Sequence, residues 1–269
     1  MYSVLLSVAV GLAAGGLLFW AEAFGAVGSA VSALAAFVAA QLGGGWFVQR
    51  KVKAGMGEVQ QVLATAQKQM EAKTRRWQTR PPDSVKAAQL ELARDQRKFV
   101  LEALACTEKL HRFDRWVPLM RRQIATAQFQ LFWMIKEWRK VDELMGKALF
   151  VDPTMQAMKM ARMHMTGAAT DEIAKVYAKA TRRLRYNQNV LVAATWSWIL
   201  VKRGELDRAF RALTDALQNS DNATLKANRE ALANNRPVHF NNSGLGDQWF
   251  ALGLEEPKIK MQRQRMQWR

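Results

Sequence analysis

The sequence contains little of what disulfide-bonded proteins, metalloproteins and most enzymes require. Its 269 residues include one cysteine, Cys106, so an internal disulfide is excluded and a reducing compartment is favoured. The three histidines, His111, His164 and His239, stand in different segments, and no H-E-x-x-H, G-x-S-x-G or G-x-x-x-x-G-K-[ST] pattern occurs. We therefore expect a protein that is not an enzyme, with no catalytic residues, no metal site and no cofactor.

Charge is almost missing from the first 48 residues. They include one acid, Glu22, and no Lys or Arg. Ala21-Glu22-Ala23 divides them into two apolar runs, 2–20 and 24–48, each near the roughly 20 residues that cross a bilayer as a helix. A helix satisfies its own backbone polar groups in lipid, so the pattern predicts a transmembrane helical hairpin over residues 1–48. A cleaved signal peptide is the weaker alternative, because no basic segment precedes the first run.

The distribution of charge around the two runs predicts their orientation. Arg50, Lys51 and Lys53 follow the second run, whereas the turn between the runs contains only Glu22. By the positive-inside rule, both termini and everything after residue 48 lie in the cytoplasm, with two spans in the inner (cytoplasmic) membrane.

Small residues predict close packing between the two apolar helices. The first run contains a G-x-x-x-G motif, Gly11 and Gly15, which allows backbones to approach in lipid. The second run has a stripe of small residues at a spacing of four, made of Gly28, Ser32, Ala36, Ala40 and Gly44. We expect the two helices of the hairpin to pack on each other. A second subunit is the alternative, so a homo-oligomer stays open.

The rest of the chain has the patterns of an all-α protein. From Val52 to Trp77 apolar residues recur at spacings of three and four, so we expect an amphipathic stalk helix, followed by a proline linker, over 49–82. Asp83 or Ser84 can cap the next helix. No later stretch alternates like a strand, and turn signals separate helical patterns. We therefore expect a helical domain over 83–253 and a basic tail over 254–269.

Residues 122–235 resemble degenerate tetratricopeptide repeats. Residues 138–153 are similar to the second helix of such a repeat, with Ala148 at its small position and Pro153 at its closing proline. A later segment, 204–217, begins with a turn glycine and has two alanines at the small positions. The matching small residues are Ala148, Ala161, Ala180, Ala209 and Ala216, of which Ala148, Ala180 and Ala216 are 32 and 36 residues apart, near the period of 34. A generic antiparallel helical domain is the alternative.

The resemblance implies a solenoid of helical hairpins that binds a protein partner in a concave groove lined by the first helix of each repeat. The expected function is thus a membrane-anchored cytoplasmic scaffold or adaptor. The residues that the resemblance assigns to this groove are Gln128, Lys159, His164 and Trp198.

The net charge of +17 supports an alternative function, which is binding to anionic lipid or, less favoured, to nucleic acid. Residues 49–122 carry 17 basic against 8 acidic side chains, and the tail from Pro257 carries 5 against none. The candidate residues for such an anionic surface are Arg75, Arg76, Arg121, Arg122, Lys258, Lys260, Arg263 and Arg265.

A methionine cluster surrounds His164. Its members are Met155, Met158, Met160, Met163 and Met165. Thioethers suit Cu(I), but on a helix these five do not share one face, so we interpret them as core or groove residues.

Overall fold

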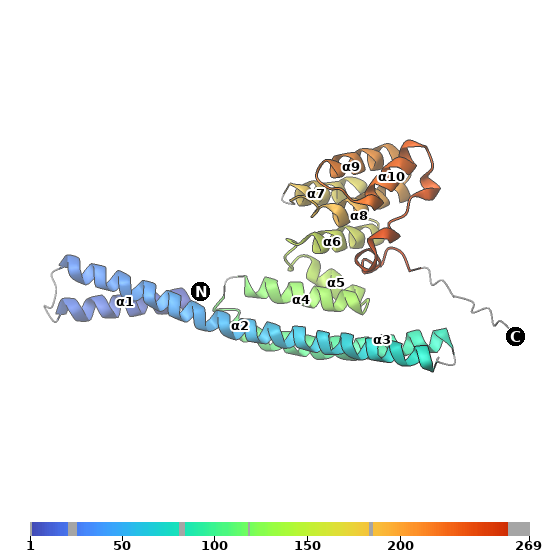
Figure 1. Cartoon of the computed structure of the whole chain (residues 1–269). Helices are drawn as coiled ribbons and strands as arrows, with labels where there is room; N and C mark the ends of the chain where they lie inside the picture. Colours follow the sequence, from blue (N-terminus) through green and yellow to red (C-terminus); the bar gives the residue numbers. More distant parts are fainter. Residues whose placement is uncertain (1, 21–25, 81–83, 118, 183–184, 258–269) are drawn as a thin grey trace. The chain divides into compact units, whose positions relative to one another are not determined.

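The computed structural model describes residues 2–20, 26–80, 84–117, 119–182 and 185–257. These residues form eleven α-helices and three short 3-10 helices, with no strand among them (Figure 1). The prediction of an all-α protein is therefore confirmed. The chain divides into two compact units, Met1–Leu149 and Phe150–Arg269. The domain boundaries that we expect at residues 48, 82 and 253 stay predictions.

The first unit begins with two helices that lie side by side (Figure 1). They are α1 (Tyr2–Trp20) and α2 (Ala26–Thr79), and α2 continues without a break from the second apolar run through the stalk. The helices are antiparallel, because Gly11 lies against Phe37 whereas Gly15 lies against Ser29. The G-x-x-x-G motif thus packs on the other helix of the same chain.

The helix α3 (Val85–Glu108) runs back along the stalk part of α2. Its N-terminus is capped by Ser84, whose side chain accepts a hydrogen bond from the backbone N–H of Ala87 at 3.0 Å. The prediction of a cap at this point is confirmed by Ser84. A shared core joins α2 and α3 to the next long helix, and its buried members are Val59, Val100, Ala103, Leu104 and Leu131.

Three further elements complete the first unit. They are η1 (Lys109–Phe113), α4 (Met120–Met134) and α5 (Trp138–Met145). The contact of η1 with α2 depends on Gly55, because a Cβ atom there would lie 2.5 Å from Cδ2 of Leu110. Leu110 packs with Met120 and Ile124 of α4. Val52 of α2 is partly buried and packs against these three residues.

The second unit is built around α8, in which every residue from Leu191 to Leu200 is buried. Helix α6 packs on α7 and α8, α8 packs on α9, and α9 packs on α10. The elements are α6 (Pro153–Met165), α7 (Thr170–Thr181), α8 (Val190–Lys202), α9 (Leu206–Gln218), α10 (Ala223–Ala233), η2 (Pro237–His239), η3 (Ser243–Leu245) and α11 (Asp247–Phe250).

The small residues that carry the resemblance to tetratricopeptide repeats are buried. Ala161 and Ala209 are fully enclosed, and Ala148, Ala180 and Ala216 are at most 4 % exposed. Gly204 has φ +79 in the turn between α8 and α9, a conformation that glycine adopts without strain. Ala148 differs from the expected pattern, since α5 ends at Met145 and Ala148 lies in the turn after it.

Candidate membrane anchor and partner-binding sites

The apolar part of the α1 and α2 pair has an inverted distribution of side chains. Ser7 and Ser29, which carry hydroxyl groups, are buried and only 1 % and 5 % exposed. Leu12 and Leu42 are 71 % and 70 % exposed. Water would oppose such an arrangement, because large apolar side chains cost free energy when they are exposed over a wide patch. The surface is therefore suited to a surrounding of lipid.

Length and composition identify one helix that could cross a membrane. Helix α2 contains an apolar window long enough for a span, near the N-terminus, and almost none of that window is buried. The apolar stretch of α1, Val4–Leu17, is shorter. One long apolar helix that could span a membrane is thus present, and α1 packs along it.

Cations stack on aromatic rings where the apolar part of α2 ends. The guanidinium of Arg50 lies 5.5 Å from the ring centre of Trp46, and the ammonium of Lys51 lies 5.7 Å from that of Phe47. A cation over an aromatic face is attracted by its quadrupole. Indole rings beside basic residues are typical of the membrane interface.

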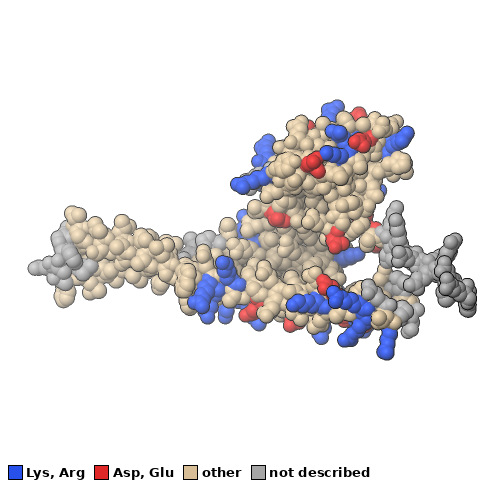
Figure 2. All heavy atoms as spheres, in the orientation of Figure 1, with Lys and Arg blue, Asp and Glu red and all other residues tan. Residues whose placement is uncertain are grey.

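The predicted anionic surface includes two exposed arginines near the end of α2, Arg75 and Arg76. Figure 2 shows Lys and Arg side chains over the α2 and α3 pair. Not every cation there is available to a ligand, because Lys73 forms ion pairs with Glu91 and Asp95 of α3 at 2.5 Å. Hydrogen bonds to Asp95 and then to Glu91 raise the pKa of Lys73 above its usual value. Lys73 thus joins α2 to α3.

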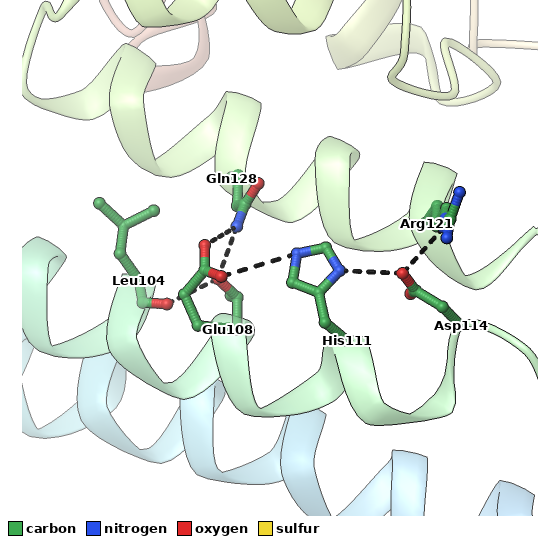
Figure 3. A network of polar contacts seen from close by, with 7 residues as sticks. Leu104, Glu108, His111, Asp114, Arg121 and Gln128 are labelled. Atoms are coloured by element: carbon green, nitrogen blue, oxygen red, sulfur yellow. Dashed lines mark hydrogen bonds and ion pairs between the residues drawn. The ribbon is translucent and has the colours of Figure 1, made fainter.

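Two of the predicted site residues belong to one polar network in the first unit (Figure 3). Gln128 of α4 donates from Nε2 to Glu108 at 2.8 Å and to the hydroxyl of Thr107 at 3.3 Å. Arg121 donates from Nε to Asp114 Oδ2 at 2.9 Å. Each of these two side chains therefore has a partner within the unit, which makes it less free to contact another molecule.

His111 completes the network (Figure 3). Its Nδ1 lies 3.1 Å from Asp114 Oδ2, and its Nε2 lies 3.7 Å from Glu108. The network connects α3, η1 and α4 through polar side chains. Arg122 is exposed and lies outside it. The remaining predicted cations, Lys258, Lys260, Arg263 and Arg265, lie outside the described residues.

In the second unit, Lys159 of α6 is half-buried, and its ammonium lies 4.9 Å from the ring centre of Phe150. Burial lowers the pKa of Lys159, and the positive charge of Lys179 lowers it further. No carboxylate is paired with Lys159 among the residues that the structure describes. The lysine is thus a cation in an environment that disfavours its charge.

His164 and Trp198, both predicted for the groove, are in contact. Their rings meet edge to face with centroids 5.5 Å apart, and Nδ1 of His164 is buried with no hydrogen-bond partner in the described chain. Burial and then the charge of Arg203 lower the pKa of His164 below its usual value. The surroundings therefore favour the neutral form of the imidazole beside the indole.

The carboxylate of Glu255 binds two indoles. It accepts hydrogen bonds from Nε1 of Trp198 at 2.7 Å and from Nε1 of Trp249 at 2.8 Å, through different oxygens. The two indole rings are 5.9 Å apart. No sequence signal indicated this contact, because Glu255 falls in the segment that we expect to be the tail. Trp198 is buried under this segment and only 7 % exposed.

The structure therefore brings together part of the predicted partner-binding set. Lys159 and His164 lie on α6, and His164 contacts Trp198 of α8. Gln128 belongs to the other unit and is bound to residues of α3.

The methionines around His164 contribute to the core. Met155, Met158 and Met160 are buried, and Met163 and Met165 are half-buried. Within the described ranges, no group of three His, Cys, Asp or Glu side chains could hold a metal ion. That the protein is not an enzyme stays a prediction.

Comparisons with protein-family models, with curated proteins and with solved structures found no match for this chain. The function is therefore inferred from its own residues.

Proposed function

We propose that the protein is an integral membrane scaffold, anchored by a hairpin of two spans, α1 and the first part of α2. The observation that carries this proposal is the inverted burial in that pair, with Ser7 and Ser29 inside and Leu12 and Leu42 outside. Basic residues at the end of the apolar part, Arg50 among them, favour a cytoplasmic location for both termini and for the helical units.

In this proposal the helices from α4 onward are tetratricopeptide-like hairpins. Consecutive pairs support it, since α4 packs on α5, α6 on α7 and α8 on α9. The enclosed Ala161 and Ala209 and the left-handed turn at Gly204 also support it, because small residues are needed where helices cross. The first helices of these pairs are then α4, α6 and α8.

The partner in this proposal is a protein that presents a carboxylate to α6. Lys159 and Lys179 repel each other, and burial already disfavours the charge on Lys159. A carboxylate brought by a partner would remove that repulsion and form a charge-assisted hydrogen bond in a partly desolvated place. His164 lies five residues after Lys159, roughly 140° around α6, and packs against Trp198 on another side of the helix.

A photo-crosslinking residue at Met163 of the full-length membrane protein tests the partner. Met163 is half-buried and four positions after Lys159, so it lies on the same side of α6. We expect one discrete protein adduct in cells, strongly reduced by Lys159→Gln and unchanged by Lys175→Gln, which alters an exposed lysine of α7. Equal adducts in both variants, or none in the parent protein, would contradict the partner site.

The anchor is tested separately by extraction and by thiol labelling. The protein should stay with membranes in alkaline carbonate, because two spans bury more apolar surface than an interfacial helix. In a Cys106→Ala background, a cysteine at Ala23 should react with an impermeant thiol reagent from outside, and a cysteine at Lys53 should not. The reverse labelling pattern would invert the topology.

A second candidate function is binding of an anionic polymer, supported by the charge of +17 and by the exposed Arg75, Arg76 and Arg122. When nucleic acid binds by counterion release, the logarithm of the binding constant falls linearly with the logarithm of the salt concentration. The slope is set by the number of phosphates contacted. Full-length protein in neutral detergent should show no such binding at physiological salt if it is a scaffold. Specific binding that persists there, and that is lost on removing residues 257–269, would favour the second function.

A further inference from the structure

A cavity of about 480 Å³ lies in the first unit, where the apolar part of α2 ends. Leu6 and Phe47 on its wall are 54 % and 58 % exposed, so the cavity opens to the outside of the unit. Its wall comes from α1, α2, η1 and the turn after η1, and the residues are Leu6, Ala40, Gly44, Phe47, Val48, Arg112, Phe113 and Trp116. Among the residues that the structure describes, Arg112 is the one charged residue on this wall.

The cavity exists because α2 has small side chains at this level. A Cβ atom on Gly44 would meet no other atom within 4 Å, so the space beside it is empty. One end of the cavity is formed by Phe113 and Trp116, which are held near α2 because Leu110 packs closely on Gly55. The wall is therefore fixed by packed helices.

Two cations stand on aromatic rings of the wall. The guanidinium of Arg112 lies 4.7 Å from the ring centre of Phe113, and the ammonium of Lys51 lies 5.7 Å from that of Phe47. In the part of the chain that the structure describes, no carboxylate lines the cavity or pairs with Arg112. The nearby Asp114 interacts with His111 and Arg121 instead. The cations are thus free to bind an anion.

We propose that this cavity binds an acyl chain of an anionic phospholipid, whose phosphate contacts Arg112 and Lys51. The inference rests on the proposed membrane anchor, because the wall joins the apolar part of α1 and α2 to the first basic residues after it. A peptide fits less well, since its backbone N–H and C=O groups would lose hydrogen bonds against an apolar wall. An acyl chain has no such groups, and a phosphate matches the two cations.

The test uses full-length protein in liposomes that contain a trace of phospholipid with a photoactivatable diazirine on its acyl chain. Phosphatidylglycerol and phosphatidylcholine versions are compared, and the labelled peptides are identified by mass spectrometry. We expect phosphatidylglycerol to label residues 112–116 several-fold more than phosphatidylcholine does.

Filling the cavity should remove this labelling. Gly44→Phe places a ring in the empty space, so labelling of residues 112–116 should fall several-fold. Gly43→Phe is the matched control, because Gly43 is exposed, also meets no atom at its Cβ position and does not line the cavity. Unchanged labelling in the Gly44 variant, or an equal loss in both variants, would overturn the site.

The headgroup contact has its own pair of variants. Arg112→Gln should reduce the preference for phosphatidylglycerol by about fivefold, the effect of one basic residue near an anionic surface. Arg50→Gln should not, because Arg50 stacks on Trp46, which lies outside the cavity wall. Equal labelling by the two lipids in the parent protein would also overturn the proposal.

Carbonate extraction of the same liposomes separates the two proposals. Release of the protein would overturn the anchor and the lipid site together. Retained protein whose labelling depends neither on the headgroup nor on Gly44→Phe would overturn the lipid site alone.

Discussion

Gly15 of α1 lies so close to Ala33 of α2 that a Cβ atom on Gly15 would stand 2.6 Å from the Cβ atom of Ala33. Cβ atoms of neighbouring residues do not approach to that distance without a shift of backbone. The two helices can therefore pack at this separation only while position 15 is glycine.

We predict that Gly15→Ala destabilises the full-length protein in mild detergent by roughly 1–3 kcal/mol, the usual cost of overpacking. The matched control is Gly16→Ala, whose Cβ atom would meet nothing within 4 Å. Alanine is favoured over glycine inside a helix by about 0.5–1 kcal/mol, so the control should be neutral or stabilising. Thermal unfolding followed by circular dichroism measures both, and equal shifts would contradict the close contact.

Glu255 accepts hydrogen bonds from Trp198 and Trp249, so substitutions at Glu255 and at its neighbour Glu256 should differ in their effect on stability. Glu255→Gln replaces a charged acceptor that serves two indoles with one carbonyl oxygen, and leaves one N–H without its partner. We expect a loss of about 1–3 kcal/mol in the free energy of unfolding. Glu256→Gln changes the exposed neighbouring acid and should have little effect. A change in tryptophan fluorescence with Glu255→Gln alone would show that the indoles respond.

The buried His164 predicts a pH dependence of stability. Its pKa in the folded protein is below the ordinary value of 6.5. As the pH falls below about 6.5, the unfolded chain therefore binds a proton at this histidine more readily than the folded protein does. The contribution of the neutral His164 to the free energy of unfolding is thus fully present above about pH 6.5 and is lost as the pH falls below that value. Unfolding free energies measured from pH 7.5 to 5 should decrease, and His164→Gln should make the decrease smaller.

The control for this pH dependence is His239→Gln, which alters an exposed histidine of η2. It should leave the pH dependence unchanged. A decrease of the same size in the His164 variant would show that other groups are responsible.

Ala216 is a buried small residue, so replacing it with a bulky residue should lower the melting temperature strongly. Ala216 is 3 % exposed, and its carbonyl oxygen accepts hydrogen bonds from Asn189 and Ser220, so Ala216→Trp should lower the melting temperature by several degrees or prevent folding. Ala227→Trp on the exposed side of α10 makes the same chemical change and should be tolerated. An unchanged melting temperature for Ala216→Trp would contradict its role as a helix-crossing position.

Much of the helical structure was predictable from local pattern. The absence of strand alternation predicted the all-α fold, and the apolar period from Val52 to Trp77 predicted the stalk, because a helical face is encoded by neighbours three and four residues apart. The cap at Ser84 and the turn at Gly204 were predictable for the same reason, since each depends on a single residue type in a local conformation. Apolar side chains are exposed on α1 and on the first part of α2 because this segment contains a single charged residue, Glu22, and so has few polar side chains for its outer face.

The sequence alone therefore determined that the chain is helical and where charge is absent. The tertiary structure decided which faces meet. Lys73 binds Asp95 across 22 residues, and Trp198 binds Glu255 across 57, although Glu255 belongs to the segment that the sequence predicts as a tail. Periodicity identifies a face but not its partner, because a contact between distant residues depends on how whole helices pack, and many pairings share one pattern. For this reason the cavity between Gly44 and Phe113 emerged only when the helices were in place.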